Sequence, residues 1–279
     1  MEKQGKKYDL KNDIIFKTFF SRKGNEEFLI DFLNSLLKIE IVKIEIQEEV
    51  NLEQLAKEEK GGRLDLQATL NDGVIVNIEL QMKDEHNIQE RTSLYASKVI
   101  SRETARGTKY EDIKKVIMIN ILGYNIFEYE EYISKTTIVL DKHREYEVMD
   151  NIQWYYIELP KFRKENPDMN EKINQWIAFI DGERKELVEV AEKKNKTLQK
   201  AREEMNYLTG DAAIRRLTEL REKWDMDYNS GISYAEKKGK KEERIKIAKS
   251  LIKMEMPIEK VIEATELTKE EIEQLKKEI

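Results

Sequence analysis

The first part of the chain places its large apolar side chains three or four positions apart. This spacing extends over residues 12–37 and is typical of amphipathic helices, with Gly24 and Asn25 separating two segments. Apolar and charged residues then alternate over residues 39–50, which predicts a strand. The polar stretch at 51–61 predicts a loop.

A β-hairpin is the clearest local signal in the sequence. Residues 64–70 and 74–82 each alternate between apolar and polar side chains, and the sequence Asn-Asp-Gly between them is a turn signature. Side chains on a strand alternate between its two faces, so each strand has one apolar and one polar face. We expect Asp65, Glu79 and Gln81 among the polar positions.

The length of the turn decides whether the two acids of this hairpin meet. A two-residue turn would put Asp65 and Glu79 on opposite faces of the sheet. A three-residue loop at 71–73 pairs them directly, keeps both apolar rows on one side, and offers Gly73 for the left-handed position. We therefore predict the three-residue loop.

Further along the chain, the pattern predicts the rest of a mixed sheet and a helix. The helix covers 86–106, and strands follow at 114–122, 133–140 and 151–159, the last ending at Pro160. Helices first, then three strands, a helix and more strands indicate a mixed α/β (α+β) core with a central mixed sheet flanked by helices.

After Pro160 the pattern changes to charged amphipathic helices. We expect helices at 170–207 and 211–226, a break at 229–231, a charged helix at 232–255, and two short helices at 257–278. The predicted domains are a core at 1–165, a helical extension at 166–230, and a charged helix with a small helical module at 231–279.

Composition narrows the chemistry that this chain can perform. The 279 residues include no cysteine and only two histidines, which excludes disulfides, zinc-thiolate sites and cysteine nucleophiles. Hydrolysis must then depend on carboxylates, which favour Mg²⁺ or Mn²⁺. The net charge of -6 argues against a surface coated with nucleic-acid contacts but leaves a local basic groove open.

The location of the protein follows from the absence of long apolar stretches. No run approaches the roughly 18 apolar residues that span a bilayer, and the N-terminus has no apolar signal segment. We expect a cytoplasmic protein without a membrane partner and without an organic small-molecule cofactor.

Two carboxylates facing each other across a sheet repel unless a cation lies between them. A divalent ion held by Asp65 and Glu79 would remove the repulsion and activate water against a phosphate. The same residues would also suit an exposed sheet face that carries two unrelated acids. The pattern alone leaves both interpretations open.

The ordered motifs of the chain resemble those of a nuclease family. These motifs are NDIIFKTFF (12–20), GRLDLQA (62–68), VNIELQMK (76–83), ERTSLYASK (90–98) and KGKKEERIKIAKSLIK (238–253). An acid on one strand followed by Glu-x-Lys on the next is the pattern of the PD-(D/E)XK nucleases. The chain resembles their recombination-promoting nuclease (Rpn) group, also labelled PD-(D/E)XK nuclease family transposases.

This resemblance implies a restriction-endonuclease-like core and a Mg²⁺-dependent DNA endonuclease, with Mn²⁺ as a possible substitute, linked to DNA recombination or mobile elements. Asp65 and Glu79 match the metal-binding acids, and Gln81 matches the position that is lysine in the wider superfamily. A neutral amide orients water or phosphate but supplies no positive charge. Lys83, two positions along the strand, is either that charge or a solvated side chain.

The helix at 86–106 should pack across the sheet and carry a further group of residues. Arg91, Tyr95 and Lys98 share one helix face. They either contact the DNA backbone and the groups around the metal, or Tyr95 lies in the core and the cations are solvated. His86 is a candidate base or incidental, and Asp13 is either an upstream acid or a helix cap.

The C-terminal segment leaves its role open. The stretch at 237–249 is rich in basic residues and is either a DNA-contacting helix or a solvated one. Thr268 and Glu271 form a predicted capping box in the final helix. Cutting both strands of a duplex favours a homodimer. A catalytically inactive DNA-binding or scaffold protein with the same fold is the alternative function, because Gln81 replaces lysine.

Overall fold

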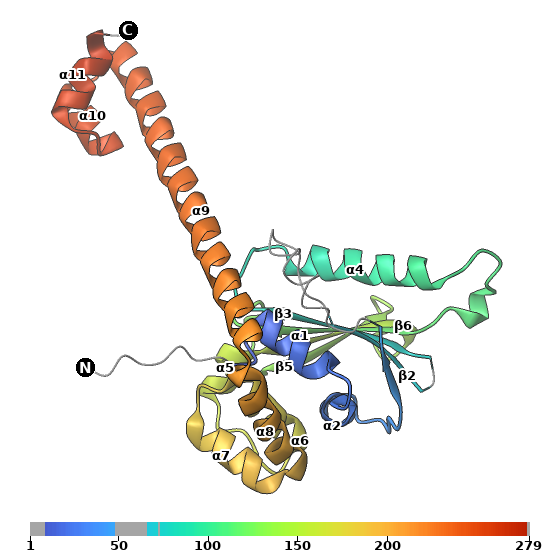
Figure 1. Ribbon diagram of the computed structural model, residues 1–279. Helices are drawn as coiled ribbons and strands as arrows, with labels where there is room; N and C mark the ends of the chain where they lie inside the picture. The colour runs from blue at the N-terminus through green and yellow to red at the C-terminus, as the bar shows by residue number, and fades with distance from the viewer. Residues whose placement is uncertain (1–8, 48–65, 72, 278–279) are drawn as a thin grey trace. The chain divides into compact units, whose positions relative to one another are not determined.

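The structure is a computed structural model in which residues 9–47, 66–71 and 73–277 are described (Figure 1). The chain divides into two units, residues 1–219 and residues 220–279, and each is described by itself. The predicted division into three domains at residues 165 and 230 remains a prediction.

A mixed six-stranded sheet forms the centre of the first unit, in the order β1-β2-β3-β4-β6-β5. The strands are β1 (Ile44–Ile46), β2 (Leu66–Leu70), β3 (Ile75–Gln81), β4 (Val116–Leu122), β5 (Ile133–Val139) and β6 (Glu147–Glu158). The strands β3, β4 and β6 are parallel to one another, and the remaining pairings are antiparallel. This sheet with its flanking helices confirms the predicted fold class.

Helix α4 (Ile88–Glu103) lies across one face of the sheet, as the sequence predicted for the helix at 86–106 (Figure 1). Ala96 and Val99 of α4 pack on Ile75 of β3 and Met118 of β4. The other face is apolar and packs against α1 (Asp13–Ser21), α2 (Glu26–Leu37) and α6 (Lys172–Asp181) in one continuous core. The polar side of the hairpin therefore faces α4.

The start of α1 corrects one expectation about Asp13. The helix begins at Asp13, and the side chain of Asn12 caps it by accepting hydrogen bonds from the amides of Ile14 and Ile15. Asp13 itself also accepts a hydrogen bond from the Ile14 amide. Asp13 is therefore the first helical residue, and Asn12 is the cap that satisfies the exposed amide groups.

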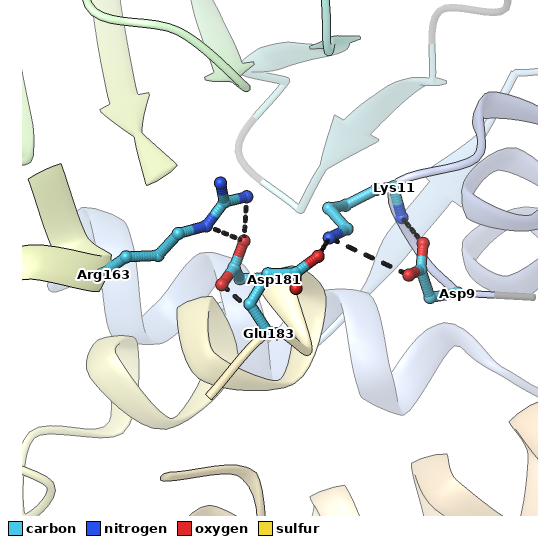
Figure 2. Close-up of polar contacts among 5 residues, drawn as sticks. All are labelled: Asp9, Lys11, Arg163, Asp181 and Glu183. Atoms are coloured by element: carbon cyan, nitrogen blue, oxygen red, sulfur yellow. Dashed lines mark hydrogen bonds and ion pairs between the residues drawn. The ribbon is translucent and has the colours of Figure 1, made fainter. Parts of the chain in front are cut away.

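Four helices follow the sheet and complete the first core, namely α5 (Leu159–Lys164), α6, α7 (Lys185–Lys194) and α8 (Lys196–Gly210). A group of charged side chains lies where the N-terminal segment meets these helices (Figure 2). Arg163 donates two hydrogen bonds, of 2.9 and 2.6 Å, to one oxygen of the buried Asp181. Lys11 contacts Glu183 nearby. The hydrogen bond to Asp181 raises the pKa of Arg163, so the guanidinium keeps its charge.

Asp31 on α2 links this helix to the helical layer. Its carboxylate accepts hydrogen bonds from Lys172 Nζ and Trp176 Nε1, each 2.9 Å long, and from Asn195 Nδ2, 3.1 Å long. Burial acts to raise the pKa of Asp31, but the hydrogen bonds from these three donors and the charge of Lys172 outweigh it and lower that pKa. The ionised form of Asp31 thus stabilises the fold.

The second unit consists of helical segments. Helix α9 (Ala212–Lys253) extends from the first unit into it, and α10 (Ile258–Thr265) and α11 (Lys269–Lys277) follow. The predicted break at 229–231 is wrong, because these residues lie inside α9. The capping box is confirmed, since Thr268 and Glu271 exchange backbone-to-side-chain hydrogen bonds of 3.0 and 3.2 Å.

The basic stretch at 237–249 carries ion pairs within the second unit. Lys241 lies 3.0 Å from Glu271, and Arg244 pairs with Glu266. These contacts favour the interpretation of a charged, solvated helix for this part of α9. Within the described part of the chain, none of the helices has the length and apolar character that a bilayer crossing requires.

Several strand boundaries differ from those predicted. Of the predicted strand at 39–50, residues 44–46 form β1 and 39–43 are not a strand, while 48–50 and the predicted loop at 51–61 lie outside the described residues. Strand β6 begins at Glu147, four residues before the predicted start at 151. Pro160 lies in the first turn of α5, where proline is tolerated because the helix there needs no amide donor.

Candidate active site

The hairpin of β2 and β3 has the predicted three-residue loop. The Leu70 amide donates to the Val74 carbonyl over 2.8 Å, and Gly73 has a φ of 84°. Leu66 lies opposite Ile78 in this register. Asp65, the residue before Leu66, lies outside the described residues, so its pairing with Glu79 stays a prediction. The loop length on which that prediction depended is confirmed.

Glu79 and Gln81 lie side by side on the face of β3 that α4 covers. Glu79 is 2% exposed, and Gln81 is also buried. The Gln81 side-chain nitrogen Nε2 donates to Glu79 Oε1 over 2.7 Å. The alternative of an exposed polar face is therefore wrong for Glu79. A buried carboxylate needs compensating charge or hydrogen bonds, because removing it from water is costly.

Arg91 of α4 supplies the positive charge at this carboxylate. Its Nη2 atom lies 2.5 Å from Glu79 Oε1, and its side chain is only 11% exposed. Nη1 lies 3.9 Å from the carboxylate of the more exposed Glu85. The guanidinium carbon also lies 5.2 Å from the centre of the Tyr95 ring, in a cation–π contact. Glu79 Oε1 thus has a cation beside it in an ion pair and a neutral amide that donates to it.

The two lysines that the sequence predicts to contact DNA are both exposed. Lys98 Nζ is 5.8 Å from the Tyr95 ring centre, and its side chain is exposed. Lys83 is exposed and lies beyond the end of β3, so its expected place on that strand is wrong. His86 is exposed and turned toward Asp84, 3.0 Å away, which agrees with the incidental interpretation.

Two residues at this site were not anticipated from the sequence. Tyr124 donates its hydroxyl to Gln81 Oε1 over 2.9 Å. Asn120 of β4 is the register partner of Glu79, and its amide donates to the Tyr155 carbonyl over 3.2 Å and to Thr92 over 3.3 Å. A polar Asn120 inside an otherwise apolar strand is a signal that the sequence does contain.

The oxygen atoms at this site are of the kind that a hard cation binds, but the described residues supply too few of them. Glu79 offers a carboxylate, and the side-chain oxygens of Gln81 and Asn120 lie on the same face. Within the described ranges, no group of three or more acidic, histidine or cysteine side chains has an arrangement that could hold a metal ion. A metal site would therefore need a further ligand, and the sequence predicts Asp65 for that place.

Comparison with known proteins agrees with this geometry. The family model described as PD-(D/E)XK nuclease family transposase matches residues 10–235. The chain belongs to this family. No curated protein and no solved structure matches the chain. The family is one of nucleases linked to mobile elements, whose substrate is DNA and which generally use divalent metal ions.

Proposed function

We propose that this protein is a Mg²⁺-dependent DNA endonuclease that hydrolyses phosphodiester bonds, with Mn²⁺ as an alternative ion. The observation that carries the proposal is the buried Glu79 carboxylate, which is approached by Gln81 from its own strand and by Arg91 from α4. Asp65 and Glu79 would hold the metal ion. The observed hairpin register supports this assignment, because continuing it by one residue would bring Asp65 opposite Glu79.

Each side chain has a role that its chemistry supports. When bound, the metal ion would lower the pKa of a bound water and offset charge on the phosphate. Gln81 positions the carboxylate and a substrate oxygen through its amide. Arg91 places a permanent cation where Gln81 has none, next to the carboxylate that faces the phosphate. Together these contacts would stabilise the charge of the reacting phosphate.

The proposed substrate contacts extend along α4. Tyr95, Lys98 and, beyond the strand, Lys83 would contact the DNA backbone, with a contribution that decreases as salt increases. A homodimer would provide two such sites for cutting both strands, and light scattering on the purified protein tests it. Linkage to DNA recombination or mobile elements is the biological setting that we propose.

The second candidate function is DNA binding without cleavage. It is favoured by Gln81, because a neutral amide replaces the lysine of the superfamily pattern and the only cation beside Glu79 among the described residues comes from another element. The two functions differ in one measurable respect. A protein that only binds DNA would give no cleavage product in any metal ion.

Cleavage of supercoiled plasmid tests the proposal directly. Wild-type protein with Mg²⁺ or Mn²⁺ should nick the plasmid, and Asp65→Ala and Glu79→Gln should each abolish nicking. Glu85→Gln is the matched control, because this carboxylate is 43% exposed and lies 3.9 Å from the other terminal nitrogen of Arg91. Intact plasmid with wild-type protein in both metal ions, or full activity of Glu79→Gln, would refute the proposed function.

A further inference from the structure

The carboxyl ends of three parallel strands bring two distant acids to the same edge of the sheet. Gln81 of β3 is the register partner of Leu122 of β4, and Leu122 is the partner of Glu158 of β6. Register partners on neighbouring strands project from the same face. Glu158 therefore lies on the face that carries Glu79 and Gln81, two strands away, and it is fully buried.

The loop that leaves β4 begins directly beside the end of β3. The Gly123 amide donates to the Gln81 carbonyl over 2.8 Å. A Cβ atom at Gly123 would lie 2.7 Å from the Met82 carbonyl oxygen, closer than such contacts allow, so a side chain there would push the loop away. The next residue, Tyr124, turns its hydroxyl onto Gln81.

Glu158 holds the loop just beyond Tyr124. One carboxylate oxygen accepts hydrogen bonds from the amides of Ile126, over 2.6 Å, and Phe127, over 3.3 Å. The other oxygen accepts from Lys161 Nζ over 2.7 Å. An acid whose two oxygens bind a loop backbone and a buried cation fixes the path of that loop.

Lys161 contacts residues near the end of the same loop. Its ammonium lies 4.5 Å from the centre of the Tyr129 ring and 3.4 Å from the Glu131 carbonyl oxygen. Both Glu158 and Lys161 are buried, and a buried ion pair is weak as a source of stability because its desolvation is costly. The contacts of both residues with the loop backbone indicate instead that the pair fixes the position of the loop.

The orientation of the Gln81 amide follows from the two contacts that it makes. Its nitrogen must face Glu79, because an amide oxygen against a carboxylate oxygen would be repulsive. Its oxygen then faces the Tyr124 hydroxyl, which donates. Loss of that donor would leave the oxygen end of the amide without its hydrogen bond, so that only the contact with Glu79 would hold the group. The chain of contacts runs from Lys161 through Glu158 and the loop to Tyr124 and Gln81.

We propose that Tyr124 is a positioning residue of the site, fixed by the Glu158–Lys161 pair, that holds the Gln81 amide with its nitrogen toward Glu79. The orientation of the amide does not depend on the nuclease activity, but the kinetic consequence rests on the proposed function. Tyr124→Phe removes the donor and keeps the ring. Glu158→Gln keeps the shape and removes the charge that holds Lys161.

Side-chain amide signals of ¹⁵N-glutamine-labelled full-length protein test the proposal without any reaction. The Gln81 signal is assigned as the one missing in Gln81→Glu. Tyr124→Phe and Glu158→Gln should both shift it. Tyr132→Phe is the matched control, because its hydroxyl is in the same loop and donates over 2.9 Å to Asn174 instead. An unmoved Gln81 signal in Tyr124→Phe would overturn the positioning role.

The role of Tyr124 and the role of the Glu158–Lys161 ion pair can be tested separately. Suppose that the Gln81 amide signal shifts in Tyr124→Phe but does not move in Glu158→Gln and Lys161→Met, both of which are folded. This result would overturn the role of the ion pair. If wild type cleaves DNA, Tyr124→Phe should lower kcat by about tenfold to a hundredfold with KM unchanged. If wild type does not cleave DNA, the proposed function fails and the amide signals still decide the positioning.

Discussion

The ion pair between Arg91 and Glu79 predicts a specific dependence of stability on charge. Arg91→Met keeps most of the apolar length of the side chain but leaves the buried Glu79 carboxylate without its cation. Removing one partner of a buried ion pair costs about 3–5 kcal/mol, because the remaining charge stays desolvated. Gln81 still donates to the same oxygen, so we take about 3 kcal/mol, the lower end of that range.

This loss of free energy translates into a measurable change of melting temperature. For a unit of 219 residues, a change of about 3 kcal/mol corresponds to a Tm lower by about 6–12 °C. Thermal and urea unfolding followed by circular dichroism, with EDTA present, measures the effect. The matched control is Arg102→Met on the same helix, where a side chain that is 60% exposed should contribute less than about 1 kcal/mol.

A double variant separates loss of the ion pair from loss of packing. Glu79→Gln combined with Arg91→Met removes both charges, so it should recover most of the stability lost in Arg91→Met alone. Mn²⁺ should stabilise Arg91→Met more than wild type, because the ion then takes the place of the guanidinium charge. Arg91→Met as stable as Arg102→Met, or no recovery in the double variant, would refute this reasoning.

Three further changes probe other parts of the structure, two in the first unit and one in the second. Gly123→Ala places a Cβ against the Met82 backbone and should lower the free energy of unfolding by about 1–3 kcal/mol, measured by urea unfolding. Asp31 has a lowered pKa, so its stabilisation is present above about pH 4 and is lost as the pH falls through the native pKa. The stability difference between wild type and Asp31→Asn should therefore shrink between pH 7 and pH 3. Thr268→Ala should speed hydrogen exchange in α11, since a lost helix cap costs about 1 kcal/mol.

Local patterns predicted most of the secondary structure because burial and periodicity coincide there. The hairpin is the best case, since one choice of loop length satisfied both the glycine at position 73 and the two apolar rows. The first residues of β6 escaped prediction because they are exposed and paired with β5 through an irregular register, so no apolar alternation marks them.

Helix α9 shows the opposite error. Asn229, Ser230 and Gly231 are poor helix formers, yet each costs at most about 1 kcal/mol inside a helix. Ending a helix leaves four amides or four carbonyls to be satisfied at each new terminus. Continuing α9 through these residues is therefore less costly than a break without caps, and a residue-by-residue propensity does not show this balance.

The sequence predicts those residues of the candidate site that belong to the regular pattern of a single strand or helix. Glu79 and Gln81 follow from alternation on β3, and Arg91 from helical spacing on α4. Tyr124 and Glu158 reach the site through the parallel pairing of β3, β4 and β6, which joins segments far apart in the sequence. Nothing local to either residue indicates that pairing, so the contact between this loop and Gln81 could be found only in the structure.

The position of the positive charge distinguishes this site from the superfamily pattern and leads to a last prediction. A lysine at 81 would deliver the charge from the strand, whereas Arg91 delivers it to the same carboxylate from the helix above. Gln81→Lys alone should therefore lower cleavage and stability, because two cations would compete for one oxygen of Glu79. Gln81→Lys with Arg91→Gln moves the charge from helix to strand and should recover activity to within about tenfold of wild type. Plasmid nicking by the three variants measures this. A gain of activity in Gln81→Lys alone would show that the missing charge is not supplied by Arg91.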